Sequence, residues 1–303
     1  MDNASATSAV PTQSRSDGER NLAAIGLVLL AVALFSAMDA MSKILASEYD
    51  PIEVVWGRYL AILAMLAPAA LRKPRLLLTS QPMLQAVRGV CVMASALLFI
   101  AGLARLPIAD ATAIGFASPL LVTAFSIPLL GEQVGVRRWS AVGIGFLGVL
   151  IVVRPGSGAV GSAALLPLSS AVCWAMSLVV TRRMRGADAP LTTLIYSSAI
   201  GFVLSGLALP LVWHAPTLSA WVMLAAMGVL SAAGQYLLIA GLSRGDASLL
   251  APFTYSQIVW ATLTGYFVFA TVPSSWTWCG AAVIVASGIY IAHRERVRRG
   301  EAR

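Results

Sequence analysis

The sequence has few charged residues. Asp, Glu, Lys and Arg make up 11% of its 303 residues, whereas soluble proteins average roughly 25%. Hydrophobic residues make up 58% of the chain, and its mean hydropathy is +0.82. A soluble domain of this length needs more polar side chains to cover its surface. The composition therefore predicts an all-α integral membrane protein that crosses the lipid bilayer many times.

Side chains for metal, cofactor and enzyme chemistry are also scarce. The only histidines, His214 and His293, are far apart in the sequence, and no CxxC or Cys/His cluster is present. The sequence contains neither the paired acids that many membrane enzymes use nor a GxxxxGK[ST] loop for ATP. We expect no cofactor, no metal and no enzymatic activity, with a membrane-embedded enzyme as the non-transport alternative. The cysteines are Cys91, Cys173 and Cys279, and all three lie inside apolar stretches.

Ten apolar segments are long enough to span a membrane. They cover residues 23–46, 52–71, 82–104, 108–130, 138–154, 161–182, 190–212, 217–242, 247–270 and 275–293. Residues 1–21 are polar and predict a disordered cytoplasmic tail, and residues 294–303 predict a basic cytoplasmic tail.

The distribution of basic residues predicts the orientation. With ten crossings, 17 Lys and Arg residues fall on the side of the two termini and two fall on the opposite side. Because cytoplasmic loops carry the excess of Lys and Arg, both termini are predicted to be cytoplasmic, in a bacterial inner membrane. This clustering between apolar runs also accounts for the net charge of +8, so we expect no nucleic-acid partner.

The chain repeats itself. Residues 101–119 (AGLARLPIADATAIGFASP) resemble residues 240–257 (AGLSRGDASLLAPFTYSQ). Further matches pair Phe116 with Phe253 and Trp139 with Trp276 at an offset of 137. Since each half contains five segments, an odd number, the second half is predicted to enter the membrane from the opposite side. The prediction is two five-helix inverted repeats, 22–154 and 155–293, which favour alternating access around a central site.

Several motifs resemble the EamA-type exporters of the drug/metabolite transporter superfamily. They are PIEVVWGRYLAIL at 51–63 and ASPLLVTAFSIPLLGEQVGVRRWSAVGIGFLGVLIVV at 117–153, with Pro119 and the Gly131–Glu132 pair in the second. The second half has no such Gly-Glu pair. Among these exporters the chain looks most similar to the YddG type, which exports aromatic and other neutral amino acids. The resemblance implies a small-molecule carrier with the fifth and tenth helices beside the cavity, and we expect it to be a monomer.

Three ionisable residues share one depth in the predicted membrane. Asp39 and Lys43 lie near the outer end of the first segment, and Arg58 lies at a similar depth in the second. Charges there are costly, so we expect an Asp39–Arg58 contact with Lys43 nearby or reaching outward. Ser36 extends the polar stripe inward. Two interpretations stay open: this cluster contacts substrate, or it only braces the two helices.

Other segments carry polar or aromatic stripes at helical spacing. Such a face is expected to look toward protein or a water-filled cavity, although Ser and Thr also serve as packing residues. The candidate substrate-binding residues are Ser36, Asp39, Lys43, Arg58, Ser95, Trp174, Ser177, Gln235, Gln257 and Trp260. Pro119 interrupts the fourth segment and is either a hinge or a fixed kink.

The predicted function is export of neutral or aromatic amino acids by a secondary transporter. The alternative substrate is another small metabolite, such as riboflavin or S-adenosylmethionine. Phosphorylated substrates are disfavoured, because Lys43 and Arg58 are the only basic residues expected within the spans. Coupling stays open between proton transport and downhill movement.

Overall fold

The computed structural model describes residues 12–131, 136–154, 161–184, 187–244, 250 and 253–301, and all the elements in these ranges are helices. In chain order they are α1 (Thr12–Leu45), α2 (Pro51–Arg72), η1 (Pro74–Leu77), α3 (Pro82–Leu103), α4 (Ile108–Gly115), α5 (Ser118–Leu130), α6 (Val136–Val153), η2 (Gly161–Ala164), α7 (Leu165–Arg183), α8 (Pro190–Ala208), η3 (Leu209–Leu211), α9 (Leu218–Arg244), α11 (Gln257–Phe269) and α12 (Ser275–Glu301).

In the described part of the chain, seven helical stretches are long and apolar enough to cross a membrane. Three shorter apolar helices lie at 139–153, 257–269 and 275–291. Each of the ten predicted segments overlaps one of these stretches, while ten crossings and the orientation of the termini stay predictions.

Two of the predicted boundaries change. Helix α1 begins at Thr12, so residues 12–21 continue the first helix instead of forming a disordered tail, and residues 1–11 lie outside the described residues. Arg88, one of the 17 basic residues counted on the side of the termini, lies inside α3, within the predicted segment 82–104. At the other end, α12 runs on to Glu301.

The fourth apolar segment is broken into α4 and α5 by a turn at Phe116–Ala117. Pro119 follows the turn in the first positions of α5, where its missing N–H interrupts the hydrogen-bond ladder. The ninth segment has a turn at Tyr255–Ser256, without a proline. There the Ser256 hydroxyl donates to Phe253 O at 2.6 Å, and such side-chain bonds compete with helical ones.

The two halves correspond at an offset of 139 residues. Helix α5 (Ser118–Leu130) corresponds to α11 (Gln257–Phe269) without any shift in either end. Each is followed by a residue in the left-handed conformation, Gly131 with φ 68° and Ala270 with φ 52°. The offset of 137 expected from matching letters is therefore wrong by two residues, and Glu132 lies outside the described residues.

Packing contacts obey the same offset. Gly102 of α3 lies against Pro167 of α7, and Gly241 of α9 lies against Val28 of α1, its counterpart. A second pair of related contacts is Gly89 with Ile200 and Gly228 with Ala61. The Phe116 ring lies 4.9 Å from that of Tyr255, so two counterparts touch where the fourth and ninth segments break. The halves are thus related by an approximate two-fold axis.

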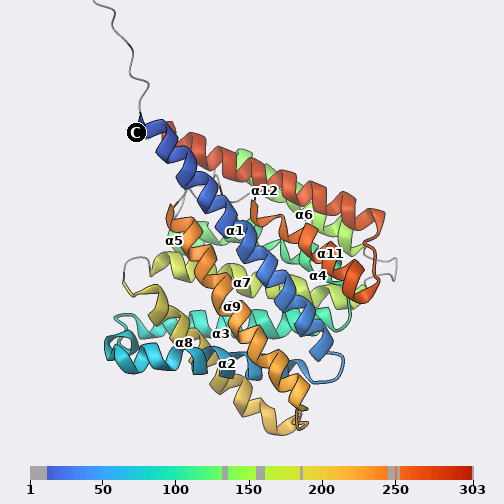
Figure 1. Cartoon of the computed structure of the whole chain (residues 1–303). Coiled ribbons are helices and arrows are strands. Elements are labelled where there is room, and N and C mark those ends of the chain that lie inside the picture. Colours follow the sequence, from blue (N-terminus) through green and yellow to red (C-terminus); the bar gives the residue numbers. More distant parts are fainter. Residues whose placement is uncertain are drawn as a thin grey trace, which may run out of the picture.

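Helices α6 and α12 pack together at one edge of the molecule, drawn at the top of Figure 1, whereas α2 and α8 lie toward the bottom. The two backbones approach closely at Gly148 and Gly280: a Cβ at Gly148 would lie 2.9 Å from Gly280 O. The Ser287 hydroxyl of α12 donates to Ala141 O at 2.5 Å. The fifth and tenth segments therefore lie to one side, as expected, although Gly143 faces open space.

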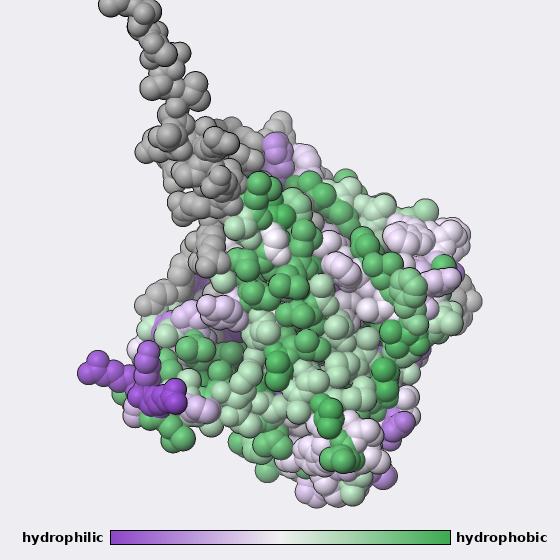
Figure 2. Space-filling model, viewed as in Figure 1, coloured by the Kyte–Doolittle hydropathy of each residue, from purple (hydrophilic) through white to green (hydrophobic). Residues whose placement is uncertain are grey.

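The outer surface is largely hydrophobic. Figure 2 shows apolar residues across the face on which α1 and α9 lie, with hydrophilic residues at the edge where α2 connects to α3. In that connection Arg72, Lys73 and Arg75 are exposed. This pattern suits a protein surrounded by lipid with basic groups at the membrane boundary.

Candidate functional site

Polar side chains of α1 and α11 meet in the interior. The Ser36 and Thr264 hydroxyls are hydrogen-bonded at 3.3 Å, and one turn further Gln257 Nε2 donates to Asp39 Oδ2 at 3.4 Å. Ser36 and Asp39 are buried, with 1% and 5% of their surfaces exposed. Three predicted site residues, Ser36, Asp39 and Gln257, are thus brought together on one helix–helix interface.

The expected Asp39–Arg58 contact is absent. Arg58 of α2 is close enough for its charge to act on the Asp39 carboxylate, but no ion pair joins the two side chains. The Arg58 guanidinium instead lies beside Tyr59, with Cζ 5.1 Å from the ring centroid. Arg58 Nε is buried and has no hydrogen-bond partner. The Asp39 carboxylate therefore accepts from an amide, while Arg58 Nε has no acceptor among the described residues.

Lys43 has a structural role in this conformation. Its Nζ donates to Leu103 O and Leu106 O, each at 2.5 Å, at the end of α3. A cation at this position satisfies helix C-terminal carbonyls and complements the helix dipole. Nζ also lies 5.6 Å from the centroid of the Phe269 ring. Lys43 therefore neither pairs with Asp39 nor reaches outward.

Arg88 is a partly buried cation inside α3 that was not among the candidate site residues. Its Nε donates to Thr181 Oγ1 at 2.8 Å, and Nη1 donates to Thr193 O at 3.4 Å and to the Ser197 hydroxyl. It therefore ties α3 to α7 and α8. The sequence could have indicated that Arg88 lies inside a helix, because it comes six residues after Pro82, the first residue of α3.

Other predicted residues hold helices together. The Ser95 and Ser170 hydroxyls are 3.0 Å apart, and Ser170 Oγ also donates to Ser95 O at 2.8 Å, which joins α3 to α7. The Ser177 hydroxyl donates to Trp174 O at 2.7 Å within α7. Trp174 itself is half-buried.

The remaining candidate residues are Gln235, Trp260 and Pro119. Gln235 is half-buried on α9, and Trp260 on α11 is 38% exposed. Pro119 lies at the helix break already described, beside the contact of Phe116 with Tyr255. No metal-binding group of three His, Cys, Asp or Glu side chains occurs among the residues that the structure describes.

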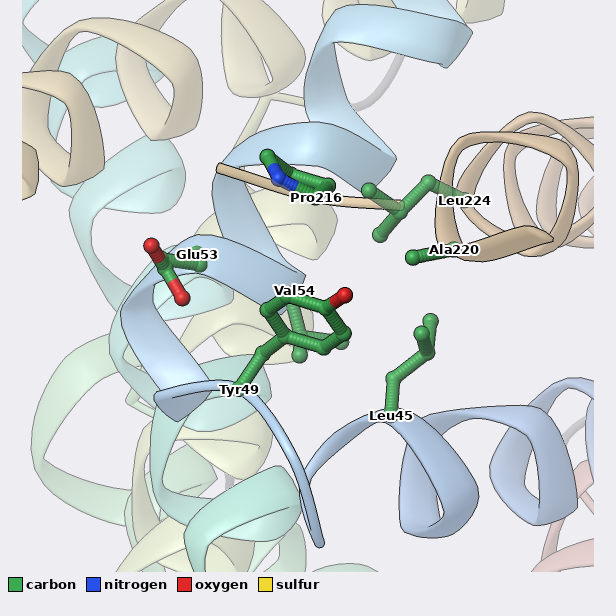
Figure 3. A pocket seen from close by; sticks show the side chains of 7 residues that line it. All are labelled: Leu45, Tyr49, Glu53, Val54, Pro216, Ala220 and Leu224. Atoms are coloured by element: carbon green, nitrogen blue, oxygen red, sulfur yellow. The ribbon is translucent and has the colours of Figure 1, made fainter. Parts of the chain in front are cut away.

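One end of the molecule is held together by the Glu53 contact, formed by Tyr49, Glu53, His214 and Thr217. Glu53 Oε1 accepts from the His214 backbone N–H, and the Thr217 N–H donates to Tyr49 Oη at 3.1 Å. Glu53 is 3% exposed, and its Oε2 has no partner. Figure 3 shows Tyr49 and Glu53 at a small pocket whose other lining residues are Leu45, Val54, Pro216, Ala220 and Leu224.

The opposite end is held by the Asp188 contact, formed by Thr79, Ser80, Gln85 and Asp188. Asp188 Oδ2 accepts from Thr79 Oγ1 at 2.5 Å and from Gln85 Nε2 at 2.7 Å, and Oδ1 accepts from Ser80 N at 3.2 Å. Partial burial opposes ionisation, but these hydrogen bonds outweigh it and hold the pKa of Asp188 below its usual range. The 22-residue helix α2, about 33 Å long, lies between the two contacts.

The geometry is that of a helical membrane protein with two halves and buried polar groups between them. The model of the EamA-like transporter family matches the chain twice, over residues 22–154 and 161–292. The chain belongs to the EamA-like transporter family. It is therefore a multi-pass membrane transporter with duplicated domains.

Several relatives of this EamA transporter have named activities. A riboflavin transporter of Rhizobium johnstonii is 33% identical over 66% of this chain and 67% of its own length. An S-adenosylmethionine uptake transporter of Rickettsia bellii is 28% identical over 90% of this chain and 94% of its own. The pseudopaline exporter CntI of Pseudomonas aeruginosa is 30% identical over 89% and 96%.

A solved structure shares the fold, with a TM-score of 0.62 and 22% identity over 91% of this chain and 98% of that one. The similarity to YddG-type exporters is not confirmed, and amino-acid export is not supported, because these relatives are named for riboflavin, S-adenosylmethionine and pseudopaline. Short polar stripes fit many small solutes, so the sequence signals used for the substrate were not specific to amino acids.

Proposed function

We propose that this protein is a secondary transporter that carries S-adenosylmethionine across a bacterial inner membrane. Relatives with this named substrate align with about nine-tenths of the chain and of their own length. The solute is a zwitterion with an additional positive charge on its sulfonium. It therefore needs a site that offers both signs of charge within an otherwise apolar protein.

The observation that carries the proposal is the state of Asp39. Its carboxylate is buried, receives one long hydrogen bond from Gln257, and forms no ion pair. Arg58 acts on this carboxylate only at a distance. A buried carboxylate without a cation in direct contact is costly unless a ligand completes its environment. The ammonium or sulfonium of S-adenosylmethionine supplies the missing charge.

The transport cycle in this proposal is alternating access. The Glu53 contact and the Asp188 contact close the two ends of the region between the repeats, and each opens in turn while the other stays closed. Both termini are cytoplasmic in this arrangement, which places the Asp188 contact on the cytoplasmic side. Helices α6 and α12 lie to one side and stay packed on each other.

Riboflavin is the second candidate. Relatives named as riboflavin transporters are 33% and 34% identical over about two-thirds of the chain. The indole rings of Trp174 and Trp260 are suited to stacking on a flat ring system. Riboflavin transport, however, leaves the charge of Asp39 without a role.

The test is transport by the purified protein in liposomes, with labelled S-adenosylmethionine and labelled riboflavin measured in both directions. We expect S-adenosylmethionine to move at least tenfold faster than in protein-free liposomes, and Asp39→Asn to remove most of this flux. Ser42→Ala is the matched control: Ser42 lies on the same helix, is equally buried and donates only to Met38 O, so this variant should keep most of the flux. Riboflavin flux without S-adenosylmethionine flux would establish the second candidate instead.

A further inference from the structure

One buried cation, Arg58, and one partly buried cation, Arg88, lie near the same tyrosine. The charges of Arg58 on α2 and Arg88 on α3 both act on the Tyr59 hydroxyl. The one carboxylate shown to interact electrostatically with Arg58 is that of Asp39, which already accepts from Gln257. Positive charge therefore exceeds negative charge around Tyr59, in a region where an uncompensated charge is costly.

The two guanidinium groups differ in what they bind. Arg88 donates to Thr181, Thr193 and Ser197, so its hydrogen-bonding capacity is used by the protein. Arg58 is only 8% exposed, and its buried Nε has no hydrogen-bond partner among the described residues. The 139-residue offset accounts for this difference. Arg88 contacts Ser197, and the counterparts of these two residues are Met227 and Arg58. The contact that corresponds to Arg88–Ser197 is therefore Met227–Arg58, in which the only acceptor is a weak one, the methionine thioether.

The Tyr59 hydroxyl is a second buried group without a partner. Tyr59 is 3% exposed, and its Oη makes no hydrogen bond in the described structure. Its ring is held in place against the backbone of α8, because Gly201 leaves no Cβ in the space the ring fills. A buried polar group left unpaired in this way destabilises the protein unless a ligand supplies the partner. Arg58 and Tyr59 are adjacent donors, and both lack an acceptor.

We propose that Arg58 and Tyr59 form the subsite that binds a carboxylate group of the transported metabolite. The guanidinium fork matches the two oxygens of a carboxylate, and the phenol donates a further hydrogen bond. One carboxylate balances the charge of Arg58, while Asp39 receives the cationic part of the same molecule. This inference rests on the proposed function, and it excludes riboflavin, which has no carboxylate.

The test compares S-adenosylmethionine with decarboxylated S-adenosylmethionine in proteoliposomes containing the wild type or Arg58→Gln, Arg58→Lys or Tyr59→Phe. The wild type should have a KM roughly 10–100-fold lower for the carboxylated substrate, the range of a charge-assisted bidentate interaction. Arg58→Gln should remove this preference by raising only the KM for S-adenosylmethionine. Arg58→Lys should restore part of it, and Tyr59→Phe should reduce it roughly threefold to tenfold.

Arg88→Lys is the matched control, because Arg88 lies near the same tyrosine but is satisfied by protein groups. It should lower the melting temperature and affect both substrates equally. If the wild type moves both substrates with the same KM, or if Arg58→Gln slows both equally at normal melting temperature, the carboxylate subsite is wrong while the transport function stands. If the wild type moves riboflavin and not S-adenosylmethionine, both the substrate and the subsite are wrong.

Discussion

The two ends of the molecule are closed by residues at equivalent positions with different chemistry. Tyr49 and Asp188 are 139 residues apart and are counterparts. Tyr49 contributes a neutral hydroxyl to the Glu53 contact, whereas Asp188 contributes a carboxylate that accepts hydrogen bonds from Thr79, Ser80 and Gln85. Charge-assisted bonds are roughly twice as strong as neutral ones. The Glu53 carboxylate accepts one such bond, from the His214 N–H, whereas the Asp188 carboxylate accepts from three residues. The two-fold axis therefore preserves where the ends close, and the side chains decide how firmly each one closes.

Covalently locking either end should have the largest effect. Cysteines introduced as Tyr49→Cys with Thr217→Cys, or as Thr79→Cys with Asp188→Cys, should be joined by a short bifunctional thiol reagent. The background carries Ala at the three native cysteines, Cys91, Cys173 and Cys279. Transport should fall to the protein-free level with either lock, because alternating access requires both ends to open.

The four single-cysteine variants are the controls and should keep transporting after the same treatment. Transport that survives one lock at full rate would mean that this end does not have to open during the cycle.

Asp188→Ala should have the next largest effect, because it removes the acceptor for several donors at once. We expect the Asp188 end to open roughly tenfold more often, as measured by maleimide labelling of a Thr192→Cys probe, which replaces a residue that is 2% exposed. Asp188→Asn keeps one carbonyl acceptor and should give a smaller increase. Equal labelling in all three proteins would show that Asp188 does not hold this end closed.

Acid should weaken the same contact only at low pH. The pKa of Asp188 is lowered in the folded protein, so the carboxylate stabilises the contact above its unfolded pKa of about 3.9 and loses this effect as the pH falls through the lowered value. Only the thiolate reacts with maleimide, so labelling of the Thr192→Cys probe is divided by that of an exposed reference, Leu78→Cys, at the same pH. This ratio should be constant between pH 5 and 8 and rise below about pH 4. In Asp188→Asn this rise should disappear; its persistence would assign the pH dependence to another group.

Tyr49→Phe should have the smallest effect. It removes exposed hydrogen bonds to Thr217, each worth about 0.5–1.5 kcal/mol at most. Labelling of an Ala220→Cys probe in the pocket of Figure 3 should rise about threefold. Val54→Ala, at the same pocket but outside the hydrogen bonds, is the comparison, and an equal rise there would mean that packing rather than Tyr49 closes this end.

The sequence predicted the positions of the helices better than the alignment of the two halves with each other. Long apolar runs and prolines at the first turn, as in Pro51, Pro82 and Pro190, are strong signals. The offset was harder, because Trp139 matches Trp276 in letters while the structure aligns it with Trp278. Apolar helix surfaces are chemically interchangeable, so single letter matches do not determine an alignment.

The site was predicted in part for a similar reason. The cost of burying charge pointed correctly to Asp39 and Arg58 as residues that need partners. It did not reveal which partners they have, since Gln257 is more than 200 residues away from Asp39 in the chain. It did not reveal the acceptors of Lys43 either, because these are backbone carbonyls, which every sequence contains.

The pairing of helices has a consequence for how such a protein can change. Helix α2 packs on α8 and α6 packs on α12, so each meets its own counterpart, as the same patch on two subunits does in an isologous homodimer. In a homodimer every substitution occurs twice, once on each side of the interface. Here the two protomers are fused into one polypeptide, and each copy can mutate alone. Because the two halves are fused, the first half can carry an arginine with an unpaired Nε at position 58. The corresponding position of the second half, 197, carries a serine.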